Sequence, residues 1–149
     1  KDGVLFASGD AQIKAGAVKT LEALGNKLKE YVAEGYTLSI EGHTDNVPMP
    51  QLDQDPYIAN VMLSQLRSLS VLRYFRNMPV YQKYDDNQKK LLEYWFTSNG
   101  LSYGKSLDSN GEYTIMKNTP IDLERSRRVE LRIVTTGEEI LENFVEKNK

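Results

Sequence analysis

Three residues whose side chains could do chemistry stand together directly after a strand-like run. They are His43, Thr44 and Asp45 in the segment GHTD, and His43 is the only histidine in the chain. An imidazole beside a carboxylate can serve acid–base catalysis, metal binding or the binding of a ligand. Each of these roles requires different partners, so each can be compared with the rest of the sequence.

A hydrolase would need a nucleophile within reach of this histidine. His43 could act as the base and Asp45 as the residue that orients it, with Ser64 or Ser68 as the nucleophile. A serine triad is recognised by its geometry, which the spacing of these residues does not establish. We therefore predict no catalytic residues and expect that the protein is not an enzyme.

The chain offers few ligands for a metal ion. A catalytic zinc site usually has three protein ligands, commonly two or three histidines, and this chain has one histidine and no cysteine. Asp45, Asp53 and Asp55 could supply oxygen atoms to calcium, but their spacing is not that of an EF-hand loop. We predict no metal and no cofactor.

Binding of a charged ligand requires a second group that complements Asp45. The helix expected after the GHTD loop can bring Arg67 beside this aspartate. A carboxylate and a guanidinium that face one cleft would suit a zwitterionic ligand, one charge for each. The same two residues could instead form an ordinary surface salt bridge of little energetic value. His43 and Thr44 could likewise only satisfy hydrogen bonds at a strand end, so the residues by themselves leave these alternatives open.

The apolar residues follow two periods, which predict the elements that position this segment. Steps of three and four residues indicate amphipathic helices, and alternation indicates half-buried strands. The order β-α-β-α-(α)-β-β indicates an α/β (α+β) fold, a mixed sheet with helices packed against it. The expected strands are 3–7, 36–42, about 101–107 and 127–136, and the expected helices are 13–34, 57–77, 85–98 and 138–147.

The helix expected at 57–77 carries polar and apolar residues at helical spacing. Asn60, Ser64 and Arg67 are four and three residues apart and therefore project from one face. We expect this polar face to lie opposite much of the buried one. The residues predicted to be buried are Ile58, Met62, Leu66, Leu69, Leu72 and Phe75.

The size and charge of the chain limit the classes of function. Its 149 residues are expected to form a single domain, 1–149. The net charge of −2, without a basic stripe, gives no sign of nucleic-acid binding, and the lack of cysteine excludes disulfides. No apolar run reaches the roughly 20 residues that span a bilayer. The abrupt, strand-like beginning KDGVLFASGD indicates a piece of a longer protein.

Three motifs, in this order, resemble the OmpA C-terminal-like family, the module of OmpA, the Pal lipoprotein and the flagellar stator protein MotB. They are GHTD after a strand, N-x-x-L-S-x-x-R at the start of a helix, and SRRVELRI on the last strand. The segments LFASGDAQI and SYGKSL are also similar to parts of the family. The resemblance spans nearly the whole chain and implies a non-catalytic domain that binds peptidoglycan.

The resemblance also implies roles for particular residues. The GHTD aspartate and the LSxxR arginine of the family bind the amine and the carboxylate of a diaminopimelate side chain, and these residues correspond to Asp45 and Arg67. An arginine of the RRV motif contributes too. Strand alternation would put Arg127 on the helix-covered face and Arg128 on the other, so we favour Arg127. The other residues implied to line the groove are Thr44, Asn60, Leu63 and Ser64.

The segment GHTDNVP looks most like the MotB branch of the family. This implies the periplasmic part of a membrane-anchored stator, with peptidoglycan as ligand and a membrane channel as partner through an N-terminal segment. The family often dimerises, so a homodimer is one candidate assembly. The alternatives are an OmpA- or Pal-like outer-membrane tether and a subunit of a non-flagellar, Zorya-type motor complex. An insertion at about 77–100, which contains Trp95, departs from the family pattern, and we expect its aromatic residues in the core.

Overall fold

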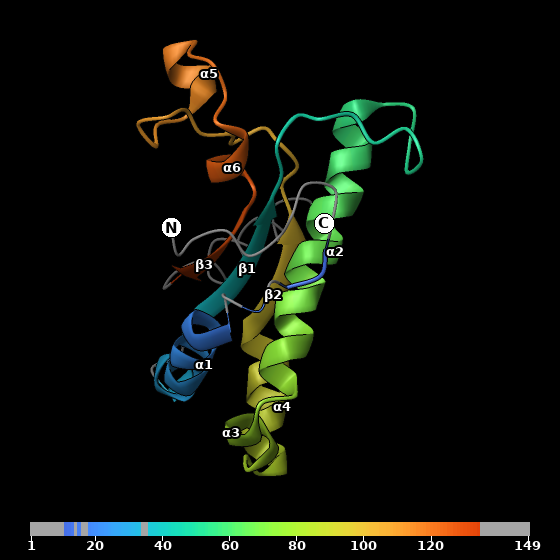
Figure 1. Cartoon of the computed structure of the whole chain (residues 1–149). Helices are drawn as coiled ribbons and strands as arrows, with labels where there is room; N and C mark the ends of the chain where they lie inside the picture. The colour runs from blue at the N-terminus through green and yellow to red at the C-terminus, as the bar shows by residue number, and fades with distance from the viewer. Residues whose placement is uncertain (1–10, 14, 16–17, 34–35, 135–149) are drawn as a thin grey trace, which may run out of the picture.

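The computed structural model describes residues 11–13, 15, 18–33 and 36–134 of the chain (Figure 1). The strand predicted at 3–7 and the helix predicted at 138–147 lie outside the described residues. Within the described part, no helix has the length and apolar character needed to cross a membrane.

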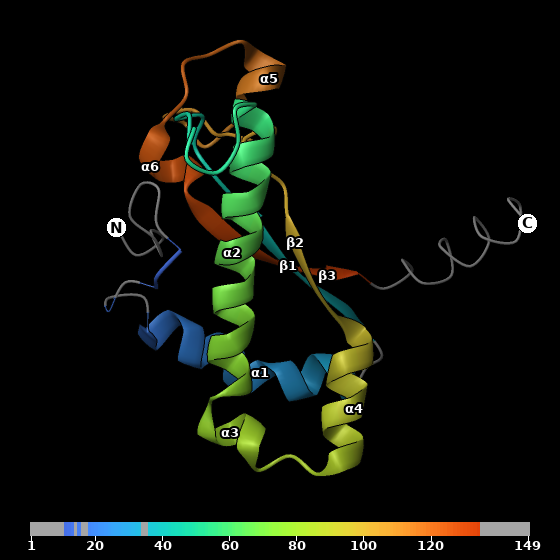
Figure 2. The same ribbon diagram turned by 90° about the vertical axis from the view of Figure 1, so that its right-hand side faces the viewer.

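A three-stranded sheet forms the centre of the described residues. Its middle strand is β1 (Thr37–His43), which pairs in parallel with β2 (Phe96–Gly100) and antiparallel with β3 (Arg128–Val134). Parallel neighbours require a long crossover connection. Here that connection contains the longest helix of the described part, α2 (Pro56–Arg76), which lies along the sheet in both views (Figures 1 and 2).

Helices surround this sheet on one face and at both ends. α2 and α1 (Val18–Ala33) contact β1, and α1, α3 and α4 gather at the end of the molecule opposite to α5 and α6 (Figure 2). The mixed sheet with packed helices confirms the predicted fold class. The bounds of the remaining helices are Pro79–Gln82 for α3, Asp86–Trp95 for α4, Thr114–Lys117 for α5 and Leu123–Ser126 for α6.

The two faces of β1 differ in chemistry because neighbouring strand residues point to opposite sides. Leu38 and Ile40 face the helices, and they are buried in the hydrophobic core. Glu41 and His43 face the other side, which we call the polar face of the sheet, and Ser39 lies with them. The core cluster contains Leu21, Leu28, Leu38, Ile40, Val71, Phe75, Met78, Tyr81, Tyr84 and Leu92.

Local signals set the ends of α2 close to the predicted positions. The side chain of Asp55 caps the helix by accepting hydrogen bonds from the backbone of Tyr57 and Ile58, and Pro56 occupies the first turn. The helix ends at Asn77, whose backbone N–H returns to the carbonyl oxygens of the last turn. Residues 44–55 form the loop that joins the GHTD corner to the start of α2.

The face of α2 that packs on the sheet is not the one predicted from the sequence. Of the predicted stripe Phe75 is buried, whereas Ile58, Met62 and Leu66 are 39–46% exposed. The face that is buried consists largely of small and polar residues. It is made up of Ala59, Asn60, Leu63, Ser64, Arg67, Ser68, Val71 and Phe75.

Close approach between α2 and the sheet explains this difference. A Cβ atom on Gly42 would overlap the backbone carbonyl of Ser64, and one on Gly100 would overlap the side chain of Ser64 and the backbone of Gln65. Only small side chains fit between backbones at this separation, so Ile58, Met62 and Leu66 turn outward. Buried polar groups are tolerated there because they find hydrogen-bond partners, such as the Ser98 hydroxyl with that of Ser68.

The segment predicted as an insertion forms helices and part of the sheet. The helix predicted at 85–98 ends at Trp95, and the next five residues are strand β2 rather than helix. The strand predicted at about 101–107 is therefore wrong, since the pairing with β1 lies earlier. Phe96 packs against the core, as expected for the aromatic residues, but Tyr94 is 61% exposed.

Candidate functional site

Asp45, the last residue of GHTD, forms an ion pair with Arg127. Its Oδ2 atom lies 3.0 Å from Nη1 of Arg127, and the two side chains are 5% and 17% exposed. Its other oxygen, Oδ1, accepts a hydrogen bond of 3.0 Å from the backbone of Val47, which makes a tight turn directly after the strand. Both carboxylate oxygens of Asp45 are thus held by the protein.

Strand register brings these two residues together. His43 is the last residue of β1 and stands opposite Arg128, the first residue of β3. Asp45 follows the end of β1, and Arg127 directly precedes β3. The two side chains therefore meet just beyond the end of the antiparallel pair. Arg127 also ends the short helix α6. Its position before the strand, rather than strand alternation, decides where its side chain lies.

Arg67 reaches the same corner from α2. Its Nη1 atom donates a hydrogen bond of 3.2 Å to the backbone carbonyl of His43, and the residue has no exposed surface. From the sequence we expect Arg67 beside Asp45, whereas in the structure the Asp45 carboxylate pairs with Arg127. Arg67 therefore binds the backbone segment that carries Asp45, and its guanidinium is buried.

Three buried polar atoms near this ion pair have no hydrogen-bond partner in the described part of the chain. They are Oγ1 of Thr44, Oδ1 of Asn60 and Nε of Arg127. The amide nitrogen of Asn60 is fully used, since it donates to the carbonyl oxygens of Val47 and Pro56 at 3.1 and 2.9 Å. Buried polar atoms are nearly always paired, so unpaired ones mark where a ligand or water belongs.

Ser64 and Leu63, also predicted to line the groove, lie on the buried face of α2. The Ser64 hydroxyl donates to the carbonyl oxygen of Val61 at 2.8 Å and accepts from the backbone of Ser102 at 3.1 Å. Leu63 is buried. These two residues support the corner, while Asp45 and Arg127 form its charged part.

Ser102 stands in a Gly-x-Ser-x-Gly segment, 100–104, which sequence reasoning about nucleophiles had overlooked. Its φ of 56° is also typical of an exposed serine nucleophile on a sharp turn. The hydroxyl, however, is fully buried and donates to the carbonyl oxygen of Tyr57 at 2.9 Å. His43 lies on the polar face of the sheet, whereas the Ser102 hydroxyl is directed to α2, so His43 does not serve Ser102 as a base.

His43 itself lies in an environment that keeps its ring neutral. Burial lowers its pKa to about 4, and the positive charges of Arg128, Lys105 and Arg132 act in the same direction, while Glu130 opposes them. Its Nε2 atom lies 3.7 Å from Oε2 of Glu130. A histidine with this pKa is unprotonated and only a weak base near neutral pH. Sequence reasoning did not single out the two glutamates that surround it.

This geometry defines a class of protein. A buried carboxylate and guanidinium face each other at the end of a strand, beside unpaired polar atoms, an arrangement suited to binding a charged ligand. Residues 5–116 match the model of the OmpA family, and the chain belongs to that family. The OmpA-like domains of MotB and Pal are non-catalytic peptidoglycan-binding domains of the cell envelope.

Solved structures agree with this assignment, whereas no curated protein matches the sequence. A MotB-like protein from Desulfovibrio vulgaris is 27% identical, with a TM-score of 0.55, and the match covers 88% of this chain and 67% of that one. The periplasmic domain of Helicobacter pylori MotB is similar in fold at 10% identity (TM-score 0.59, 97% and 80% covered). The peptidoglycan-associated lipoprotein from Burkholderia pseudomallei is also similar in fold, at 18% identity (TM-score 0.55, 89% and 90% covered).

Proposed function

We propose that this chain binds the diaminopimelate-containing stem peptide of peptidoglycan and thereby anchors a membrane protein to the cell wall. One observation carries the proposal: the Asp45–Arg127 ion pair is largely buried, and Thr44, Asn60 and Arg127 itself each carry a buried polar atom without a partner in the described part of the chain. Diaminopimelate carries an ammonium and a carboxylate on one carbon. A protein carboxylate and guanidinium that already face each other complement these two charges.

The ligand would be bound by exchange of partners. Its ammonium would take the place of Arg127 at the Asp45 carboxylate, with Oδ1 of Asn60 and Oγ1 of Thr44 as further acceptors. Its carboxylate would bind the guanidinium of Arg127, whose Nε is unpaired. Asp45 and Arg127 would each exchange one partner of opposite charge for another. Binding would therefore not leave the buried carboxylate unpaired.

Arg67 has a distinct place in this proposal. Its bond to the backbone of His43 fixes the segment that carries Asp45. We propose that it shares in the carboxylate site only when this segment shifts on binding, and that otherwise it acts as a positioning residue. Leu63 and Ser64, which are buried, support this site from beneath.

We further propose that 1–149 forms one domain and serves as the periplasmic part of a MotB-like stator. The similarity to a MotB-like protein at 27% identity supports this role over the OmpA- or Pal-like tether. A homodimer and a membrane channel subunit are the partners that this role implies. An upstream transmembrane helix with a membrane-embedded aspartate would support the stator, whereas a lipid-attachment cysteine would support a tether.

The test is sedimentation with purified sacculi that contain diaminopimelate. We expect the wild-type protein to pellet with them, Asp45→Ala and Arg127→Ala to stay in solution, and Arg125→Ala to pellet like wild type. Arg125 is a suitable control because it is an arginine of the same segment that pairs with Asp122 instead of Asp45, and its side chain is 45% exposed. Binding by both site variants would refute the site, and soluble fragments released into the supernatant would mean an enzyme.

A second comparison tests the ligand chemistry. Sacculi whose stem peptides carry lysine present the ammonium without the adjacent carboxylate, so they should pellet the wild-type protein poorly. Equal binding to both kinds of sacculi would show that Arg127 does not bind the carboxylate of the diaminopimelate side chain. It would leave Asp45 as the contact to the ammonium and would refute selectivity for diaminopimelate.

A further inference from the structure

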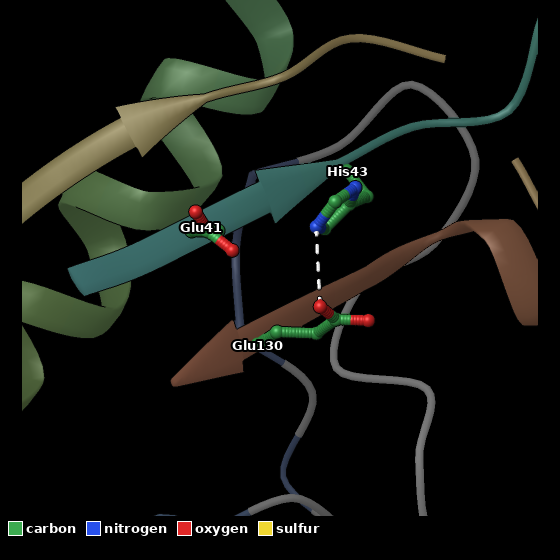
Figure 3. A group of neighbouring side chains, drawn as sticks. All are labelled: Glu41, His43 and Glu130. Carbon is green, nitrogen blue, oxygen red and sulfur yellow. Dashed lines mark ion pairs between the residues drawn. The ribbon is translucent and has the colours of Figure 1, made fainter. Parts of the chain in front are cut away.

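A second group of charged side chains lies on the polar face of the sheet, away from the helices. Glu41, His43 and Glu130 each have one nitrogen or oxygen atom within 4.8 Å of those of the other two. Figure 3 shows Glu41 and His43 on β1 and Glu130 on the neighbouring β3, with the histidine ring directed toward Glu130. Glu41 and Glu130 are paired in the strand register, and His43 is two residues along the same face.

The histidine ring in this group has no hydrogen bond within the described part of the chain. Its side chain is 1% exposed, and both Nδ1 and Nε2 lack a partner. The separation of 3.7 Å between Nε2 and Oε2 of Glu130 is too long for a hydrogen bond. A buried imidazole with two unpaired nitrogen atoms is unusual, because such groups are normally satisfied by protein or by a bound species.

The two glutamates stand opposite each other on antiparallel strands, and each is bound by an arginine. Like charges that face each other across antiparallel strands are destabilising. Arg132 Nε holds Oε1 of Glu41 at 2.8 Å, and Arg128 Nε holds Oε1 of Glu130 at 2.7 Å. Each arginine thus binds its glutamate through Oε1, and the Oε2 atom of Glu130 is directed toward His43.

We propose that Glu41, His43 and Glu130 together bind one divalent transition-metal ion of the zinc type. One imidazole nitrogen and two carboxylate oxygens form a ligand set that zinc accepts, with a fourth position left for water. Bonds of about 2.0–2.2 Å to zinc separate neighbouring tetrahedral ligands by roughly 3.3–3.6 Å, so the Nε2–Oε2 pair is already close to the required spacing. Rotation of the side chains of Glu41 and Glu130 would bring their carboxylate oxygens to the spacing that the metal requires.

The neutral state of His43 favours this role, because a metal binds the unprotonated ring. The positive charges of Arg128, Arg132 and Lys105 act against a cation and limit its affinity. They also provide a sharp test. Removal of Arg132, which is about half exposed, frees a ligand oxygen of Glu41 and deletes one repelling charge, so it should strengthen metal binding.

The experiment is calorimetric titration of the metal-free chain with zinc chloride. We expect one zinc ion per chain and an increase in melting temperature on binding. Glu41→Gln, Glu130→Gln and His43→Gln should each weaken binding by at least about tenfold, the range found even for residues that only support a metal ligand. Arg132→Gln should bind zinc more tightly than wild type. Calcium and magnesium should bind poorly, since they prefer sites made entirely of oxygen atoms.

Controls separate a specific site from zinc on the surface. Glu93→Gln removes an exposed carboxylate that pairs with Arg76, and it should leave zinc binding unchanged. Cobalt should give the intense absorption of a tetrahedral site in the wild type and not in His43→Gln. The proposal is overturned if zinc does not bind, if the ligand variants bind it as well as wild type, or if Arg132→Gln fails to bind more tightly. None of these measurements depends on peptidoglycan binding.

Discussion

The carboxylate of Asp45 and the guanidinium of Arg127, 82 positions apart in the sequence, meet with 3.0 Å between Oδ2 and Nη1. Neither residue belongs to a regular strand, but each lies next to the end of one. The antiparallel pair of β1 and β3 ends at His43 and Arg128, and this register fixes the distance between the two charges. The binding site that we propose thus depends on the pairing of two strands far apart in the chain.

The first prediction concerns the stability of this ion pair. Asp45→Asn should lower the free energy of unfolding by about 1–3 kcal/mol, because a largely buried guanidinium loses its charged partner. Chemical denaturation measures the change. The exposed pair of Glu112 and Lys117 offers a control, since Glu112→Gln should change stability by less than about 0.5 kcal/mol. Equal effects of the two substitutions would contradict the burial of the Asp45 pair.

The second prediction concerns the contact of α2 with the sheet. Gly42→Ala should destabilise the protein strongly, by roughly 3 kcal/mol or more, because the added methyl group overlaps the backbone carbonyl of Ser64, which cannot move without the helix. Gly104→Ala is the matched control, since its nearest atom, a carbonyl oxygen of Leu101, lies at 4.0 Å. Thermal unfolding of both variants gives the answer. A tolerated Gly42→Ala would mean that α2 lies farther from β1.

The third prediction separates structure from binding at Arg67. Arg67→Ala removes a buried side chain and leaves the carbonyl oxygen of His43 without its donor, so we expect a loss of about 3–5 kcal/mol in unfolding free energy. Arg73→Ala, an exposed arginine of the same helix, should have little effect. If Arg67→Ala is as stable as Arg73→Ala but does not sediment with sacculi, Arg67 is a ligand contact rather than a positioning residue.

The fourth prediction is a loss of stability in mild acid that is due to His43. In the unfolded chain this histidine takes up a proton near its ordinary pKa of 6.5, whereas burial lowers its pKa to about 4 in the folded protein. Acidification therefore favours the unfolded state throughout this interval. We expect a loss of about 2 kcal/mol between roughly pH 7 and pH 5 in metal-free buffer.

Comparison with His43→Gln isolates this contribution. The variant should show a flatter dependence of unfolding free energy on pH over the same range, since the other groups near the ring, Glu41, Glu130, Arg128 and Arg132, are unchanged. A wild-type protein whose stability stays constant from neutral pH to pH 5 would show that the ring is already hydrogen-bonded or protonated in the folded state.

Local sequence patterns were sufficient to place the main elements. The predictions for β1 and α2 differ from the structure by one residue at each end, because strand alternation and a capping aspartate act over a few neighbouring residues. The prediction for the last strand, 127–136, begins one residue before β3 (Arg128–Val134) and agrees with it over the other described residues. These features need no information from distant parts of the chain.

Two predictions were wrong because they depended on packing. The apolar residues of α2 are spread widely around the helix, so their spacing did not select the side that meets the sheet. Gly42 and Gly100 determine which side meets the sheet, because they allow the small residues of α2 to approach the strands closely. The segment Phe96–Gly100 has no alternation of apolar residues, and it is a strand because it pairs with β1.

The sequence by itself determined the family, the fold class and the group of residues at the GHTD corner. Only the tertiary structure decided which charges meet there. It paired Asp45 with Arg127, placed Arg67 against the backbone of His43, and brought Glu130 to the histidine ring. The physical reason is that these contacts depend on the register of β1 with β3 and on the depth at which α2 packs. Both are set by interactions between segments that no local pattern connects.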